Sequence, residues 1–232
     1  MKNIEATKIL DKIVGQIFGC QNPLTLDQAM SKFAFDINLP QKVYDTTTNE
    51  VTWAQSTNPT KFITLNNVLQ RSKVDDWIIP KRPIENVDDI LTIWAETNLM
   101  TTERTRESMN VSKSDNISFC QNVFRSQDCG ESKNLLFCDG VYKSEFTSAS
   151  QRSITLNFCI RAEDSRECSN SFNVIWSGKV SNSFFIQDCY DISDCMFCSH
   201  ITSKRYCIAN MQFEKEEYMK LHKEVIQWIL TS

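Results

Sequence analysis

The sequence has little of several features that would place it in a class at once. It holds only five glycines, five prolines and two histidines in 232 residues, and its 25 basic and 29 acidic residues nearly cancel. So few glycines and prolines exclude a loop-rich or disordered chain. A net charge of -4 gives no sign of nucleic acid or of an anionic membrane as a partner. We therefore expect a folded chain that binds a protein partner or forms a homo-oligomer, with no nucleic-acid and no membrane partner.

Long hydrophobic runs are also missing. No stretch reaches the roughly 18 apolar residues that a transmembrane helix needs. The first residues, from Met1 to Phe18, mix Lys2, Lys8 and Lys12 with acidic residues and so lack the apolar centre of a signal peptide. The sequence predicts a location in the cytoplasm or in a particle assembled inside the cell. Reduced thiols rather than disulfides are expected there.

Cysteine, in contrast, is abundant, and nine of the ten cysteines lie in the second half of the chain. Every separation between these nine is a multiple of three. They are Cys120, Cys129, Cys138, Cys159, Cys168, Cys189, Cys195, Cys198 and Cys207. Nearly all other residues on the same phase are serine, threonine or aliphatic. A shared phase of this kind indicates a repeat architecture with a narrow interior that accepts small side chains.

A seven-residue motif recurs along this segment: Ser, any residue, Asn, aliphatic, any residue, aromatic, Cys. Copies begin at Ser114, Ser132, Ser153 and Ser171, and a weaker copy begins at Cys189. Successive copies start eighteen positions apart, except for one longer step from Ser132 to Ser153. This spacing predicts a parallel β-solenoid of about five eighteen-residue coils, with a three-residue insertion in one coil.

Stacking of such coils predicts ladders of similar side chains. An aliphatic ladder would comprise Ile117, Leu135, Leu156, Val174 and Ile192, and a ladder of thiols and a hydroxyl would comprise Cys120, Cys138, Cys159, Ser177 and Cys195. Turn residues would be Asn116, Asn134 and Asn173, and an aromatic stack would hold Phe119, Phe137, Phe158 and Trp176. The first two ladders are expected to line the interior, and the amides to bond from coil to coil. The pattern leaves open whether the aromatic stack faces in or out.

Three parts are expected along the chain: an α+β head domain over 1–110, the β-solenoid over 111–210, and a C-terminal capping helix over 211–232. In the head, hydrophobic periodicity and capping residues predict helices over 4–18, 26–32 and 87–97 and a strand over 33–39. A hairpin is expected around Thr46 to Asn49. The head and the last helix would cover the two open ends of the solenoid.

The last cysteines also suggest a zinc site. Cys195 and Cys198 have the C-x-x-C spacing of a zinc knuckle, and Cys189, Cys207 and His200 lie nearby. However, each of these cysteines keeps the three-residue phase of the cysteines upstream, which no metal geometry requires. The sequence therefore predicts no cofactor and no metal, and a zinc-binding module remains an alternative.

An enzymatic alternative follows from the coil length. Eighteen-residue coils are similar to those of hexapeptide-repeat acyltransferases, which use a histidine as general base. The likeness is limited to coil length, because the aliphatic and the small residue are three positions apart here, as in Leu135 and Cys138, rather than four. In such an acyltransferase His200 would be the base, since His222 belongs to the predicted terminal helix.

The steps of three between Ser, Cys and small apolar residues resemble those of cysteine- and serine-rich β-solenoid repeat proteins, such as the beetle antifreeze proteins, over Val111 to Cys207. The resemblance implies a tight coil only, because the flat Thr-x-Thr ranks that those proteins present to ice are missing. The predicted function is a rigid, non-catalytic structural or binding module for assembly or recognition. A component of a virion or of another large complex is one setting for such a module.

Overall fold

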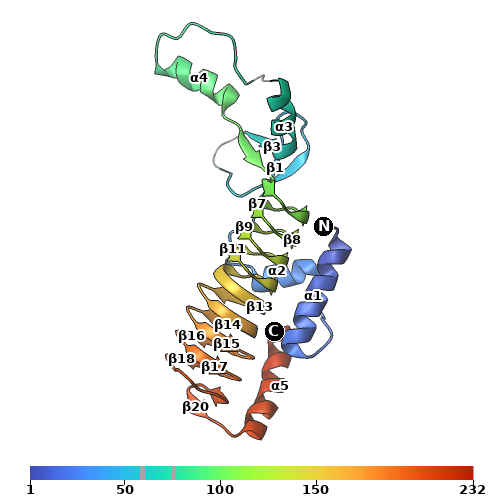
Figure 1. Ribbon diagram of the computed structural model, residues 1–232, viewed down its shortest axis with the longest axis vertical. Coiled ribbons are helices and arrows are strands. Elements are labelled where there is room, and N and C mark those ends of the chain that lie inside the picture. Colours follow the sequence, from blue (N-terminus) through green and yellow to red (C-terminus); the bar gives the residue numbers. More distant parts are fainter. Residues whose placement is uncertain (58–60, 75–76, 232) are drawn as a thin grey trace.

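The computed structural model describes residues 1–57, 61–74 and 77–231 of the chain. A long stack of strands forms the body, a small α+β unit lies at one end, and helices lie along one side (Figure 1). The architecture is an α+β N-terminal region followed by a parallel β-solenoid of about nine turns and a C-terminal helix. Within the described residues, no helix has the length and apolar character needed to cross a membrane.

The solenoid strands are short and follow one another closely. They are β5 (Thr105–Arg106), β6 (Met109–Ser112), β7 (Asp115–Ser118), β8 (Gln121–Phe124), β9 (Gln127–Gly130), β10 (Lys133–Leu136), β11 (Asp139–Tyr142), β12 (Glu145–Ser148), β13 (Gln151–Glu163), β14 (Arg166–Ile175), β15 (Gly178–Ser181), β16 (Phe184–Gln187), β17 (Tyr190–Ser193) and β18 (Met196–Ser199). They pair in parallel at an offset of twelve residues, so that Lys133 lies between Gln121 and Glu145.

One coil therefore contains twelve residues, so the predicted eighteen-residue coil and the predicted number of about five coils are both wrong. Every third residue from Asn110 to Ala209 has a positive φ, close to +50° or +60° in nearly all cases, so each side is three residues long and a coil has four sides. The backbone repeats every three residues whatever number of sides closes a coil. The three-residue phase in the sequence therefore gives the length of each side, but not the number of sides in a coil.

The motif spacing has a simple explanation in this coil. An eighteen-residue step spans one and a half coils, so successive copies of the motif lie on opposite sides of the solenoid. The longer step from Ser132 to Ser153 needs no insertion, since the twelve-residue register continues through Glu145 and Asn157. The predicted three-residue insertion is therefore also wrong.

The predicted interior ladders are consequently not stacked as expected. Ile117 pairs with Cys129, and Leu135 lies between Val123 and Thr147. The residues themselves are nevertheless inside, because every position on the phase of three from 114 to 198 is buried. All ten cysteines are free thiols. The interior is thus a narrow core of small and aliphatic side chains.

Serine hydroxyls in this interior bond to the backbone of two coils. Ser126 Oγ donates to the Phe124 carbonyl at 3.1 Å and accepts from the Cys138 backbone N–H of the next coil at 3.0 Å. Like the Ser126 hydroxyl, the Cys138 thiol donates to the carbonyl two residues earlier, that of Leu136, at 3.4 Å. A buried backbone group without a partner is costly, so these side chains satisfy donors and acceptors that the corners leave free.

Replacing Ser126 with alanine is expected to lower the free energy of unfolding by about 1–3 kcal/mol, because the Cys138 N–H would stay buried without an acceptor. Ser126→Cys should cost less, since a thiol makes the same contacts more weakly. The control is Ser181→Ala, whose outward hydroxyl makes no hydrogen bond with the described residues. Equal stabilities of Ser126→Ala and Ser181→Ala in urea unfolding would contradict this role.

Asparagine and aspartate occupy many corners because they tolerate the left-handed conformation. Asn110 Nδ2 donates to Asn122 Oδ1 at 2.7 Å, and Asn122 Nδ2 donates to Asn134 Oδ1 at 2.8 Å. Amides therefore bond from coil to coil, but with a step of twelve residues. Three different corners hold the predicted turn residues, which are Asn116, Asn134 and Asn173.

The four residues of the predicted aromatic stack lie on four different corners and do not stack on one another. Phe119 and Trp176 are 46% and 61% exposed, whereas Phe137 is buried. Phe158 stacks instead on Phe146, one coil away, with 4.7 Å between the ring centroids. Aromatic side chains at corners thus point outward, and what covers a corner determines their exposure.

Three helices cover one side of the solenoid: α1 (Asn3–Phe18), α2 (Leu26–Phe33) and α5 (Lys215–Thr231) (Figure 1). Beneath them runs an outward column with a step of twelve residues, which we call the helix-covered side. It consists of Phe124, Leu136, Ser148, Ile160, Phe172, Phe184 and Met196. The predicted helices over 4–18 and 26–32 are confirmed, but they pack against the solenoid. Likewise α5 lies along the side and not across the end.

The rest of the predicted head forms a small unit at the first coils. It contains the hairpin of β1 (Gln41–Tyr44) and β2 (Val51–Ala54), the parallel pair of β3 (Phe62–Thr64) and β4 (Met100–Thr102), and the helices α3 (Leu65–Val74) and α4 (Val87–Thr97). The predicted hairpin and the helix over 87–97 are confirmed. The predicted strand over 33–39 is wrong, because α2 extends to Phe33 and the next residues form a turn.

A buried carboxylate joins this unit to the solenoid. The Asp115 side chain is fully buried and accepts hydrogen bonds from Arg104 Nε and Nη2, both at 3.0 Å. It also accepts from the backbone N–H groups of Arg104, Gln55 and Asn116, each at 2.9 Å. The residue that follows β2, the chain that enters the first coil and the first coil itself are therefore all bonded to one carboxylate.

The far end of the solenoid is closed by a second hairpin. β19 (Cys207–Ile208) and β20 (Met211–Gln212) pair in an antiparallel manner. Gln212 Nε2 donates to the Arg205 carbonyl at 2.7 Å and to the Phe213 carbonyl at 3.3 Å. The edge that parallel stacking leaves open is thus occupied before the chain enters α5.

Candidate functional site

The side opposite the helices is open, and we call it the open face. Its central column is Ser118, Gly130, Tyr142, Ile154, Arg166, Gly178 and Tyr190, with each residue paired to the next at a step of twelve. These positions are six residues, or half a coil, from those of the helix-covered side. The open face therefore lies across the solenoid from the side that the helices bury.

Large apolar side chains are exposed along the open face. Tyr142, Ile154 and Tyr190 are each about 40% exposed, and Trp176 at the adjoining corner is 61% exposed. Isolated exposed apolar residues are ordinary, whereas several on one rigid side are typical of interaction surfaces. Tyr142 and Tyr190 lie four coils apart, which corresponds to roughly 19 Å at the spacing of neighbouring strands.

Each tyrosine of the column lies over a glycine of the preceding coil. A Cβ atom on Gly130 would come within 2.8 Å of the Tyr142 ring, and one on Gly178 within 3.3 Å of the Tyr190 ring. The two glycines let the rings lie close against the backbone, where they lose conformational freedom. Gly178 also leaves the column low between Arg166 and Tyr190.

A hollow of about 560 Å³ opens at this low point. Trp176, Arg166 and Tyr190 contribute large side chains to its lining, and Gly178 lies among them. Arg166 is exposed and makes no ion pair within the part of the chain that the structure describes. The hollow thus combines two aromatic rings with a cation that is available to a ligand.

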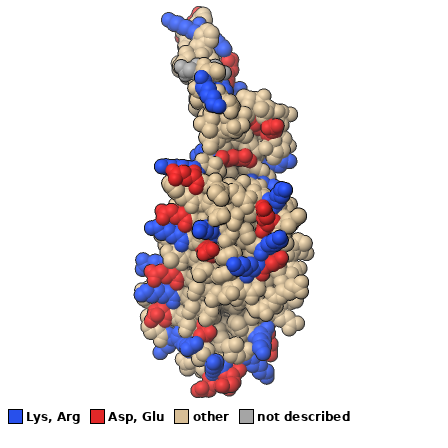
Figure 2. Space-filling view, turned by 45° about the vertical axis from the view of Figure 1, so that its right-hand side comes forward, with Lys and Arg blue, Asp and Glu red and all other residues tan. Residues whose placement is uncertain are grey.

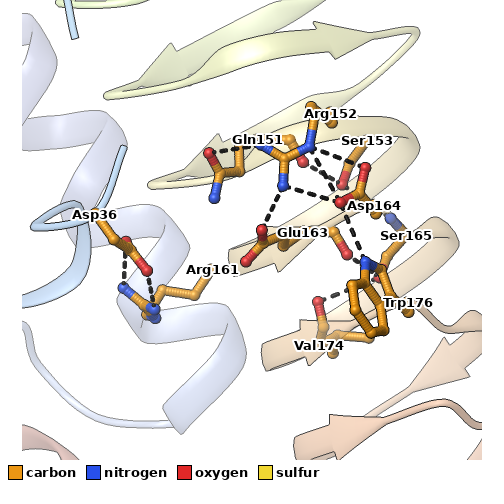
Figure 3. A network of polar contacts seen from close by, with 10 residues as sticks. All are labelled: Asp36, Gln151, Arg152, Ser153, Arg161, Glu163, Asp164, Ser165, Val174 and Trp176. Carbon is orange, nitrogen blue, oxygen red and sulfur yellow. Dashed lines mark hydrogen bonds and ion pairs between the residues drawn. The ribbon is translucent and has the colours of Figure 1, made fainter. Parts of the chain in front are cut away.

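A network of polar contacts fixes the wall formed by Trp176 (Figure 3). Arg152 Nε donates to the two carboxylate oxygens of Asp164 at 3.0 and 3.1 Å, and Arg152 also pairs with Glu163. Trp176 Nε1 donates to Asp164 Oδ2 at 3.2 Å. The hydrogen bonds from Arg152 and Trp176 outweigh the effect of burial and lower the pKa of Asp164. Asp164 therefore stays ionised and holds the indole ring in one orientation.

At a corner that borders the helix-covered side, directly after Ile160, Arg161 binds the segment that follows α2 (Figure 3). Arg161 Nη1 donates to Asp36 Oδ1 at 3.0 Å and to the Phe33 carbonyl at 2.7 Å, and Nη2 donates to Asp36 Oδ2 at 2.8 Å. These bonds fix the edge of the helix-covered side. The ion pair of Arg161 and the network around Trp176 are separate, because they have no residue in common.

Comparisons with models of known protein families, with curated proteins and with solved structures gave no match. Charged side chains of both signs are interspersed over the body in the view of Figure 2. Bulk charge thus gives no preference for a partner of one sign on the surface shown there.

The cysteines considered for zinc lie inside the last coils. The thiols of Cys189, Cys195, Cys198 and Cys207 each contact the carbonyl two residues earlier, at 3.2 to 3.9 Å. Among the residues that the structure describes, no three His, Cys, Asp or Glu side chains come together so as to hold a metal ion. These cysteines lie together in the interior because each one belongs to the buried core of the solenoid.

The pKa of every interior thiol except Cys198 is raised, unlike that of a reactive thiol. Burial raises the pKa of Cys138 to about 12 and that of Cys168 to about 11. Cys195 and Cys198 share a hydrogen bond, which raises the pKa of Cys195 and lowers that of Cys198. Cys198 is only 2% exposed, so this thiol has no access to a substrate. The cysteines are therefore packing residues of the core.

Neither histidine lines the hollow. The His200 side chain is 74% exposed at a corner, with Nδ1 3.9 Å from Asp188 Oδ2, and it does not line the hollow. His222 belongs to α5 and is stacked on Phe184 of the solenoid, with 4.8 Å between ring centroids. Burial lowers the pKa of His222. His200, the proposed acyltransferase base, therefore lies outside the lining of the hollow and next to Asp188, which is part of that lining.

Sequence reasoning missed most of the open face. Of its residues only Trp176 was singled out, as part of the aromatic stack. A usable signal was present, because glycine is followed twelve residues later by tyrosine at Gly130 and Tyr142 and again at Gly178 and Tyr190. It could be read only with the twelve-residue step, which the eighteen-residue motif concealed.

Proposed function

We propose that this chain is a non-catalytic binding module that recognises a protein partner through the open face. The observation that carries the proposal is the hollow formed by Trp176, Tyr190 and the exposed Arg166, opposite the side that the protein's own helices bury. Trp, Tyr and Arg are the residue types that contribute most to binding energy in protein interfaces.

The rigidity of the site supports this use. The solenoid register holds Arg166, Gly178 and Tyr190 in adjacent coils, and Asp164 holds the Trp176 ring. Side chains that are already ordered lose little conformational entropy when they bind, so more of the contact energy appears as affinity. A stack of repeats also offers an extended surface that suits assembly, as in a virion or another large complex.

The groups around the hollow suit recognition better than acid–base catalysis. Asp164 has a lowered pKa because of its bond to Arg152, whereas a carboxyl that acts as a general acid needs a raised one. Cys189, which borders the hollow from inside, has a pKa raised by burial and therefore keeps its proton. Asp164 and Cys189 position and pack, and the ligand would meet aromatic rings and a cation beside the carboxylates of Asp164 and Asp188.

The partner can be captured at the hollow itself. A photoreactive phenylalanine analogue placed at Trp176 should cross-link to one protein in cells that make this chain, whereas the same analogue at Ser181, on a neighbouring side, should not. With that partner purified, Trp176→Ala and Arg166→Ala should each weaken binding by about tenfold or more, which corresponds to about 1.4 kcal/mol.

The control for this measurement is Lys133→Ala, an exposed residue on the same side of the coils as Ser181, which should bind as the unmodified protein does. If the analogue gives the same products at Trp176 and Ser181, the open face is not the recognition surface. If all variants bind the captured protein equally, the hollow does not contribute to recognition.

A further inference from the structure

A second and larger cavity lies at the other end of the solenoid, away from the open face. It has a volume of about 710 Å³ and is bounded by α1, the segment joining α1 to α2, and the corner of the first coils. Cavities of this size are typical of sites for small molecules. The proposed function makes no use of it.

Two cations of the solenoid border this cavity. Lys113 and Arg125 occupy the same corner in successive coils, as the hydrogen bond from Arg125 N to the Ser112 carbonyl at 3.1 Å shows. Neighbouring coils are separated by roughly 4.8 Å, so the two side chains leave the corner close together. Neither forms an ion pair with any residue that the structure describes.

Aromatic rings hold both cations in place. The Arg125 guanidinium lies 4.9 Å from the centroid of the Trp53 ring, and the Lys113 ammonium lies 5.1 Å from that of Phe124 and 5.8 Å from that of Trp53. Contacts of this kind orient a cation and leave its N–H groups free to bond elsewhere. The positions of the two charges are thus set before a ligand arrives.

Arg125 also has an unsatisfied donor. Its Nε is shielded from solvent and has no hydrogen-bond partner among the described residues. A buried donor of a charged group that lacks an acceptor carries a desolvation cost. Because Nε is shut off from solvent, a ligand in the cavity would meet the terminal Nη groups of the guanidinium, which have no hydrogen-bond partner among the described residues either. The two neighbouring charges, with Nη groups free on one of them, point to an anionic ligand.

The opposite wall has a different chemistry. Asn22 Nδ2 donates to Asp11 at 2.7 Å, and Thr7, Thr25 and Asp27 also border the cavity. Carboxylates, hydroxyls and amides of this kind bind the hydroxyl groups of a ligand. A ligand that fits both walls would be negatively charged at one end and hydroxylated at the other.

We propose that this cavity binds a phosphorylated small molecule that carries hydroxyl groups, with its phosphate between Arg125 and Lys113. A phosphate monoester bears a charge of about -1.5 to -2 at neutral pH. Two neighbouring cations therefore balance its charge more closely than they would balance the single charge of a carboxylate. The planar guanidinium can bond two phosphate oxygens, and the ammonium supplies the second charge. The hydroxylated body lies towards Asp11, Thr25 and Asp27.

Titration calorimetry with inorganic phosphate, glucose 6-phosphate and glucose tests this proposal on the full chain. Glucose 6-phosphate should bind saturably at millimolar concentration or below and more tightly than inorganic phosphate, and glucose should not bind measurably. Arg125→Gln should weaken binding by about tenfold or more, and Arg125→Lys by less, because lysine keeps the charge and loses the planar fork.

Lys113→Gln should weaken binding severalfold, whereas Lys133→Gln, which removes an exposed lysine on a different side, should leave it unchanged. Thermal unfolding of each variant shows whether it is folded. The proposal is overturned if neither phosphate compound binds saturably to the unmodified protein, or if folded Arg125→Gln binds as tightly as the unmodified protein. It is also overturned if glucose and glucose 6-phosphate bind equally well.

Discussion

Replacing Asp115 with alanine is expected to lower the free energy of unfolding by about 3–5 kcal/mol, because the partners of a buried ion pair would lose their anion. The substitution would leave Arg104 without its carboxylate and would remove the acceptor of three backbone N–H groups, those of Gln55, Arg104 and Asn116. Since Asp115 links the N-terminal unit to the first coil, this unit should open first. Urea unfolding monitored by circular dichroism measures the loss.

The matched control is Glu145→Ala, which removes an exposed carboxylate from a solenoid strand and should change the free energy by no more than about 0.5 kcal/mol. Limited proteolysis adds a local measurement. Cleavage between residues 41 and 104 should become faster in Asp115→Ala and stay unchanged in Glu145→Ala. If the two variants were equally stable, Asp115 would not hold the two parts together.

Replacing Phe172 with alanine is expected to lower the free energy of unfolding by about 3–5 kcal/mol, as for other large aromatic residues in a core. The Phe172 ring lies at the centre of the helix-covered side, with centroids 5.7 Å from Phe18 of α1, 5.5 Å from Phe33 of α2 and 5.3 Å from Phe185. Its loss would leave a cavity beneath two helices at once. Backbone amides of α1 should then exchange with solvent faster.

Phe119→Ala provides the control, since Phe119 is a corner phenylalanine that is 46% exposed and contacts Arg106 at 5.2 Å. This change should cost no more than about 1 kcal/mol, because little apolar area is uncovered. Hydrogen exchange in α1 that is the same in both variants would show that the helices do not depend on the apolar column beneath them.

Much of the architecture could be predicted from particular residues. The shared phase of Ser126, Leu135 and Cys138 predicted an interior of small and aliphatic side chains, and all three are buried. The helix opened by Thr25 was predicted from its capping box, and the Thr25 and Gln28 side chains make both reciprocal bonds to the backbone. These features depend on contacts within a few residues of chain, which local patterns record.

The candidate site could not be predicted in the same way. The column of Tyr142, Arg166 and Tyr190 exists only at a step of twelve residues, and that step is set by which strands pair across coils. Whether an outward residue is free or covered depends in turn on where the helices pack. Phe172 and Tyr190 are both outward aromatic residues, yet Phe172 is 5% exposed beneath the helices and Tyr190 is 41% exposed.

By itself, the sequence determined that the second half of the chain turns a small side chain inward at every third position, because a three-residue side ending in a left-handed corner is a local conformation. Only the tertiary structure established that four such sides close a coil and that the helices cover one side and leave the opposite side open. The reason is physical: closure of a coil and packing of helices depend on hydrogen bonds and apolar contacts between residues distant in the chain. A local repeat of three residues is compatible with several numbers of sides.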